Sequence, residues 1–131
     1  MRPKPDENVV IWLDNQKGKA VWVCSITRAE ILAGLAMMPE GKRKQGLMEA
    51  AAAMFDEDFA SRCLPFDSDA ANHYASIVSE RTRQGKPVSV EDAQIASIAR
   101  SNGLSIATRN GKDFAGIGRL VVINPWLVTS R

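Results

Sequence analysis

Two carboxylates of the 131-residue chain fall on helix faces that the sequence otherwise makes apolar. Glu30 shares a helical face with Ile26, Ala33, Gly34 and Met37, and Asp92 shares one with Ile95, Ala96 and Ala99. A carboxylate buried without a partner costs free energy. Coordination of a metal ion is one way to remove that cost, so both acids are candidate metal ligands.

Helix capping is the other explanation for these two acids. Thr27-x-x-Glu30 and Ser89-x-x-Asp92 both match the capping box, in which the acid reaches back to the N–H of the capping residue. Taken singly, each acid is better explained as a cap. Taken together, and with the strand end described next, they favour a metal site. We then expect Glu30 and Asp92 to lie close together at the carboxyl edge of a sheet.

A third acid follows the end of an apolar strand, in the stretch SIATRNGKDF. Residues 104–107 form the expected strand, followed by Thr108, Arg109, Asn110 and Asp113. Sites in open α/β sheets lie at the carboxyl ends of strands, and hydroxyl, amide and carboxylate oxygens suit a hard cation. A plain turn explains the stretch equally well, because Asn-Gly favours turns. Arg109 is either a phosphate contact or a solvated loop residue.

Helix-like and strand-like segments alternate along the chain. Helices are expected over residues 6–16, 27–38, 39–59, 67–84 and 89–102, and strands over 19–24, 62–66, 104–108 and 120–126. Strands that alternate with helices predict an α/β fold, with a parallel sheet between helices.

The composition is that of one ordinary globular domain spanning residues 1–131. The net charge of +2 neither requires nor excludes a nucleic-acid partner. Cys24 and Cys63 lack the spacing of a zinc or redox motif and are interpreted as reduced core thiols. No apolar run is long enough for a membrane span and no signal-peptide core is visible. We therefore expect a cytoplasmic protein without a membrane partner.

Several residues are expected at the surface. Met37, Met38, Met48 and Met54 lie on two consecutive helices. They give more apolar surface than one small domain easily covers, which predicts self-association. The basic run 42–44 is best explained as a solvated face, with phosphate contact only weakly indicated. The helix at 67–84 is expected to pack through Ala71, Tyr74, Ala75 and Val78, which leaves His73 exposed and without a role.

The segments SITRAEILAGL, GKRK, LPFD, YASI, VEDAQIASIAR, LSIATRNGKDF and VVINPW resemble, in this order, those of PIN-domain toxins of the VapC/FitB type. The resemblance covers nearly the whole chain. It implies a PIN-like fold whose twisted parallel sheet carries acids that bind Mg²⁺ or Mn²⁺ and cleave RNA. It also implies an antitoxin partner and a homodimer. By motif, Glu30, Asp92 and Asp113 match metal-binding acids, and Thr108, Arg109 and Asn110 line the same edge.

The chain departs from that family at its start. Family members open with an apolar strand that ends in an Asp and is central in the sheet, whereas this chain opens with Met1–Pro5. The first strand and its acid are therefore expected to be missing, and neither Asp6 nor Asp14 is placed to replace that acid. Two functions stay open: a metal-dependent endoribonuclease toxin with impaired activity, and an inactive PIN-like module that binds an antitoxin or RNA.

Overall fold

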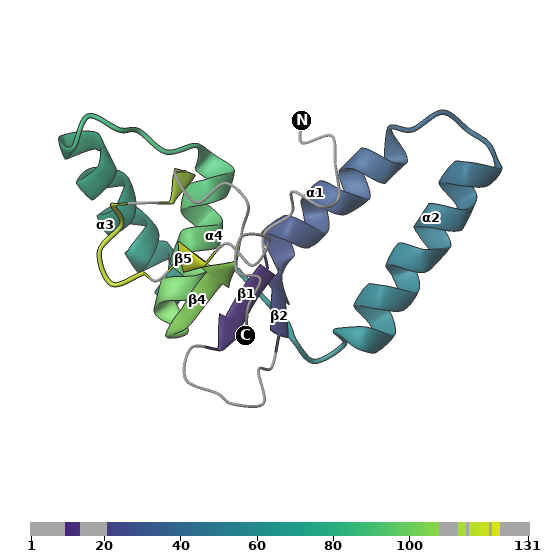
Figure 1. Cartoon of the computed structure of the whole chain (residues 1–131), viewed down its shortest axis with the longest axis horizontal. Helices are drawn as coiled ribbons and strands as arrows, with labels where there is room; N and C mark the ends of the chain where they lie inside the picture. The colour runs from purple at the N-terminus through teal and green to yellow at the C-terminus, as the bar shows by residue number, and fades with distance from the viewer. Residues whose placement is uncertain (1–9, 14–20, 108–112, 115, 121, 124–131) are drawn as a thin grey trace, which may run out of the picture.

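The computed structural model describes residues 10–13, 21–107, 113–114, 116–120 and 122–123 (Figure 1). Its elements are, in chain order, β1 (Val10–Leu13), β2 (Val21–Cys24), α1 (Ser25–Ala36), α2 (Lys42–Ala53), the π-helical segment η2 (Met54–Asp58), β3 (Cys63–Leu64), α3 (Ser68–Arg83), α4 (Val90–Ser101), β4 (Leu104–Ala107) and β5 (Val122–Ile123). The helices predicted after residue 26 and the strands predicted after residue 18 are confirmed where the structure describes them. Their bounds differ, since α1 begins and ends two residues earlier than predicted and the end of the second predicted helix is the π-helical segment η2.

The strands form one sheet in the order β3-β2-β1-β4-β5. β2 pairs with β3 in parallel, and so does β4 with β5. β1 lies between these pairs and is antiparallel to both β2 and β4. β2 and β4 therefore run in the same direction, and the carboxyl ends of all strands except β1 lie at one edge. The predicted α/β fold with flanking helices is confirmed, and one strand runs against the rest.

The helix predicted over residues 6–16 is wrong where the structure describes it, because Val10–Leu13 is strand β1. Ile11 lies opposite Ile106 of β4 on one side and Trp22 of β2 on the other. The sequence Val-Ile-Trp-Leu is β-branched and aromatic, and such residues suit a pleated surface better than a helix. Pairing on both sides also satisfies backbone groups along this strand. The central position of the sheet, which we expected to find without a strand, is thus filled by β1.

Capping residues and glycines set the bounds of α3 and α4. Asp67 caps α3 by accepting a hydrogen bond at Oδ1 from the N–H of Ala70, at 2.9 Å. α3 ends in a Schellman motif around Gly85, whose φ is +72°. Gly103, with φ +68°, follows α4 in the same left-handed conformation.

α3 packs against α4, and α4 packs along β4. The buried residues of α3 are Ala70, Ile77 and Arg81. The predicted packing face was therefore placed wrongly, since Ala71 and Ala75 are exposed. The buried residues of the main core include Phe114 and Ile117, which follow β4 in the chain. They also include the fully buried Cys24, Ile95, Ala96, Ile98, Ala99 and Ile106.

Cys24 and Cys63 are free thiols, as expected from the sequence. Cys24 is completely buried, and this burial is the main reason that the pKa of its thiol is raised above the usual value. A raised pKa keeps the thiol protonated and unreactive at neutral pH.

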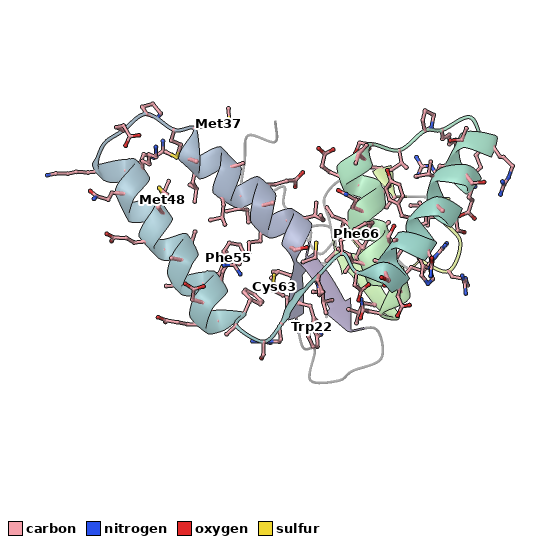
Figure 2. The ribbon with its side chains drawn as sticks, turned by 180° about the vertical axis from the view of Figure 1, so that it is seen from behind. Trp22, Met37, Met48, Phe55, Cys63 and Phe66 are labelled. Carbon is pink, nitrogen blue, oxygen red and sulfur yellow. The ribbon has the colours of Figure 1, made fainter. Side chains whose placement is uncertain are left out.

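α1 and α2, with η2, lie side by side and reach away from the sheet as an arm, which we call the α1–α2 arm (residues 25–58) (Figure 1). Its own core is small, with Val23, Ala51 and Phe55 buried. Along α1 only Thr27 is buried, while Ala33 and Met37 are exposed. The face that carries Glu30 is therefore not the buried face that the sequence predicted. Figure 2 shows Met37 and Met48 near the outer end of this arm.

No helix among the residues that the structure describes is long and apolar enough to cross a membrane.

Candidate active site

The connections of the sheet bring Glu30 and Asp92 toward one edge. α1, which carries Glu30, begins directly after the carboxyl end of β2. Only residues 102 and 103 separate α4 from β4, and the two elements pack together, so α4 runs back along the strand. Its N-terminus, with Asp92, therefore lies on the side of the sheet where β4 ends. α1 also contacts α4, which places the two acids on neighbouring helices.

Glu30 is the sixth residue of α1 and is half-buried. The capping-box explanation for it is wrong, because the helix begins at Ser25 and its N-cap is Cys24, without a side-chain capping bond. Thr27, the expected cap, lies inside the first turn and is only 2% exposed. Its Oγ1 atom is 3.6 Å from Sγ of Cys24. The carboxylate of Glu30 therefore has another role than capping this helix.

Asp92 is buried in the first turn of α4, with 7% of its surface exposed. Ser89 is the N-cap, as predicted, and its Oγ accepts a hydrogen bond from the N–H of Asp92 at 3.1 Å. The predicted partners on its face, Ile95, Ala96 and Ala99, are all buried. The dipole of α4 favours a negative charge at this end of the helix. The Asp92 carboxylate is therefore buried because it lies on the core-facing side of the first turn of α4.

Asp113 lies six residues after β4 and is half-buried. Its main-chain carbonyl oxygen accepts a hydrogen bond from Nη1 of Arg81 on α3, at 3.1 Å. This tertiary contact fixes the backbone at Asp113 from outside its own turn. The other residues predicted at this strand end, Thr108, Arg109 and Asn110, lie outside the described residues.

Carboxylate oxygens are suitable ligands for Mg²⁺ or Mn²⁺. Within the described part of the chain, however, no group of three or more His, Cys, Asp or Glu residues is arranged to hold a metal ion. Glu30 and Asp92 sit on contacting helices, and Asp113 sits on a third segment. As placed here, these three acids do not by themselves complete a metal site.

A polar network beside the main core was missed by the sequence analysis. Arg100 of α4 is buried and donates from Nε to Nδ1 of His73 at 2.9 Å, from Nη1 to the carbonyl of Gly118 at 2.9 Å and from Nη2 to Oγ of Ser76 at 3.0 Å. Glu80 lies 3.7 Å from the same guanidinium. His73, expected to be exposed and idle, is half-buried and accepts a hydrogen bond.

Burial and neighbouring positive charges lower the pKa values of two residues in this network. Burial is the largest cause that lowers the pKa of His73, followed by the nearby charges of Arg100 and Arg119. Burial and Arg119 likewise lower the pKa of Arg100. The sequence did contain a signal for Arg100, because it lies four residues after the buried Ala96, on the core side of α4.

The same kind of signal marks Arg81, which lies four residues after the buried Ile77 on α3 and is itself only 5% exposed. Burial of a guanidinium requires hydrogen-bond partners. An arginine at a core position of a helix therefore predicts a tertiary anchor, and Arg81 provides one at Asp113.

Residues 2–120 match the model of the PIN domain family. The chain is 38% identical over 126 residues to Toxin FitB of Neisseria gonorrhoeae, covering 96% of this chain and 90% of that protein. It is 36% identical over 125 residues to the VapC ribonuclease Y4jK of Sinorhizobium fredii, covering 95% and 89%. The solved structure of FitAB bound to an IR36 DNA fragment superposes with a TM-score of 0.78 at 34% identity, covering 84% of this chain and 76% of that one.

The chain therefore belongs to the PIN domain family. The predicted resemblance to toxins of the VapC/FitB type is confirmed.

Proposed function

We propose that this protein is the endoribonuclease toxin of a toxin–antitoxin module. The observation that carries the proposal is the match of residues 2–120 to the PIN domain, together with 36% identity to a VapC ribonuclease along 95% of the chain. The placement of Glu30 and Asp92 on contacting helices supports it, because RNA cleavage by carboxylates requires them at a common edge.

We further propose that cleavage depends on Mg²⁺ or Mn²⁺. Such an ion, when bound, lowers the pKa of a water molecule and neutralises charge on the phosphate. We propose that the carboxylates of Asp92, Glu30 and Asp113 bind this ion. Asp92 is the first choice because it is buried at a helix N-terminus. Thr108, Arg109 and Asn110 are proposed for the phosphate-binding edge of the site.

The decisive experiment compares wild type, Asp92→Asn and Asp69→Asn on RNA with Mn²⁺ or Mg²⁺ and with a chelator. Asp69 is the matched control, since it also lies in the first turn of a helix but on the exposed start of α3. We expect Asp92→Asn to lower kcat/KM by about 100-fold or more and Asp69→Asn to leave it unchanged. Undiminished cleavage by Asp92→Asn would refute the assignment, and cleavage that survives the chelator would refute the metal dependence.

One observation favours a second function, a PIN module that binds without cleaving. The described residues include no group of three metal-ligating side chains. In that case the wild-type chain would bind RNA or an antitoxin in the presence of Mn²⁺ but leave the RNA intact, and Asp92→Asn would behave like wild type in binding.

We also propose that the α1–α2 arm is where an antitoxin or a second copy of the chain binds. Leu32, Met37, Leu47 and Met48 are exposed there by 36, 73, 40 and 41%. Exposed apolar side chains grouped on two helices are typical of interaction surfaces. The similar solved structure is of FitAB bound to an IR36 DNA fragment. Replacing Leu47 and Met48 by Asp should then weaken co-purification of the antitoxin, while the equivalent double change at the exposed Ala71 and Ala75 should not.

A further inference from the structure

Three backbone positions of the segment that begins with Asp113 are hydrogen-bonded to side chains at the C-terminal end of α3. We call residues 113–118, of which residue 115 is not described, the 113–118 segment. Arg81 donates to the carbonyl of Asp113 at 3.1 Å, Gln84 donates to the carbonyl of Gly116 at 2.9 Å, and the N–H of Gly118 donates to Oε2 of Glu80 at 3.2 Å. Three side chains from the last turns of one helix thus fix three backbone positions of this segment.

The two glycines of the segment are shaped to this contact. A Cβ atom at Gly116 would lie 2.9 Å from Oε1 of Gln84, and one at Gly118 would lie 3.0 Å from Oε2 of Glu80. Gly116 also has φ +86°, a conformation that side chains other than glycine rarely adopt. A side chain at either position would push aside the end of the Gln84 or Glu80 side chain that bonds the segment, and the left-handed φ of Gly116 favours glycine in addition.

Buried side chains lock the segment between these points. Phe114 is 1% exposed and Ile117 is 4% exposed, and both belong to the main core. Asp113 comes directly before Phe114, so its backbone is held by Arg81 on one side and by a core residue on the other. The position of the Asp113 backbone is therefore set by tertiary contacts, and not only by the turn that the sequence predicted.

Arg81 connects this segment to a second one. Its Nε donates to the carbonyl of Lys86 at 2.7 Å, while its Nη1 donates to Asp113. Lys86 is the last residue of the Schellman motif that ends α3, where its N–H also donates to the carbonyl of Arg81 at 3.0 Å, and it lies three residues before Ser89, the cap of the helix that carries Asp92. One buried guanidinium therefore joins the two segments that lead to Asp92 and Asp113. Lysine cannot replace it fully, because an ammonium lacks the planar fork that reaches two acceptors.

We propose that Arg81 is a positioning residue for the active site, which sets the spacing of Asp92 and Asp113 by binding the backbone at Lys86 and at Asp113. The proposal rests on the ribonuclease function proposed above. It predicts that loss of Arg81 leaves the fold intact but loosens both segments and impairs catalysis more than substrate binding.

The first test needs no activity. Amide hydrogen exchange is measured across the whole chain for wild type, Arg81→Gln and Arg83→Gln. Arg83→Gln is the matched control, because it removes the same charge from the same helix and because, among the described residues, Arg83 bonds to Ser79 within that helix. We expect Arg81→Gln to speed exchange in residues 86–92 and 113–118 by at least about tenfold, and Arg83→Gln to leave both unchanged. Unchanged exchange in Arg81→Gln would overturn the proposal.

The second test separates positioning from stability. In RNA cleavage with Mn²⁺, Arg81→Gln should lower kcat by about 10- to 100-fold, keep KM within a few-fold and raise the Mn²⁺ concentration that gives half-maximal rate. Arg81→Lys should recover part of kcat. Full kcat in a variant whose segments have loosened would overturn the positioning role while leaving the ribonuclease function intact. A wild-type chain that neither cleaves RNA nor binds Mn²⁺ in calorimetry would instead refute the ribonuclease function, and the positioning role with it.

A second variant, Gln84→Ala, provides a test in case Arg81→Gln does not fold. Gln84 is exposed and contributes one bond to the segment, at Gly116. We expect it to fold like wild type, to speed exchange only in 113–118 and to lower kcat by a few-fold. Wild-type exchange and wild-type kcat in Gln84→Ala would contradict the proposal even if Arg81→Gln proved insoluble.

Discussion

The half built from α3, α4 and β4 and the α1–α2 arm are made of similar helices but are stabilised differently. In the first half, α4 has eight buried residues, and the core extends to Phe114 and Ile117. In the arm, α1 and α2 each bury one residue. In Figure 2, Phe66 lies on the side of α3 and α4, and Met37 and Met48 lie toward the outer end of the arm.

The difference shows which part of the domain contributes most of the buried apolar surface that stabilises the fold. Burial of apolar surface is the main favourable term in folding, so α3, α4 and β4 supply most of it. The arm has a small core and local ties, such as Arg28 stacked 5.0 Å from the ring centre of Phe55 and Lys44 bound to the carbonyl of Ala36 at 3.0 Å. We therefore expect the two regions to respond differently to equivalent substitutions.

The largest effect is expected from Phe114→Ala. Phe114 is 1% exposed and lies in the main core, next to the residue that Arg81 holds. Removing a buried phenyl ring should lower the free energy of unfolding by about 3–5 kcal/mol. Urea denaturation followed by circular dichroism measures it. A loss below about 1 kcal/mol would show that the 113–118 segment is not part of the core that stabilises the domain.

Phe55→Ala is the corresponding change in the arm and should cost less, roughly 2–3 kcal/mol. Phe55 is 2% exposed, but most of its neighbours are only partly buried and can close over the gap. Hydrogen exchange should rise first in α1 and α2 and leave α4 protected. If α4 loses protection to the same extent, the two regions unfold as one unit and the comparison above is wrong.

A smaller effect is expected from pH, acting in the first half. Burial, Arg100 and Arg119 place the pKa of His73 below its ordinary value of 6.5. The unfolded chain therefore binds more protons than the folded one in this range, so stability present above pH 6.5 is lost as pH falls through the folded pKa. Asp69 opposes the shift only as its smallest cause. Urea midpoints at pH 7.5 and pH 5 measure the loss.

His73→Gln is the control for this prediction, because it can still accept the hydrogen bond from Arg100 and cannot titrate. His73 is the single histidine of the chain, so the variant should show a flatter pH dependence above pH 5. The same slope in wild type and variant would assign the effect to carboxylates.

The smallest effect on stability is expected from Met48→Ser at the outer end of the arm. Met48 is 41% exposed, and an exposed side chain away from the core usually changes stability by no more than about 0.5 kcal/mol. Its effect should appear in association, as a shift of sedimentation toward the monomer or weaker retention of an antitoxin. A large loss of stability with unchanged association would mean that Met48 belongs to the arm's own core.

Sequence patterns were sufficient where local signals decide structure. Ser89 caps α4 as predicted, Gly103 follows the end of this helix, and the apolar face that carries Asp92 is buried as predicted. Capping bonds and left-handed glycines act over a few residues, so they can be identified from sequence alone. The PIN-like fold, by contrast, was implied by the resemblance of sequence segments to PIN-domain toxins, and the candidate acids came from helix faces, a strand end and that resemblance.

Tertiary contacts decided the rest. The sequence pattern around residues 10–13 indicated a short helix, whereas pairing with β2 and β4 makes these residues a strand. The face around Glu30 looks apolar in sequence, but it is covered only in part: Ile26 packs against the main core and Glu30 is half-buried, whereas Ala33 and Met37 are exposed. The position of Asp113 depends on Arg81, 32 residues earlier. Local propensity cannot predict such contacts, because the residues that pair with a strand, cover a helix face or bond a backbone group lie elsewhere in the chain.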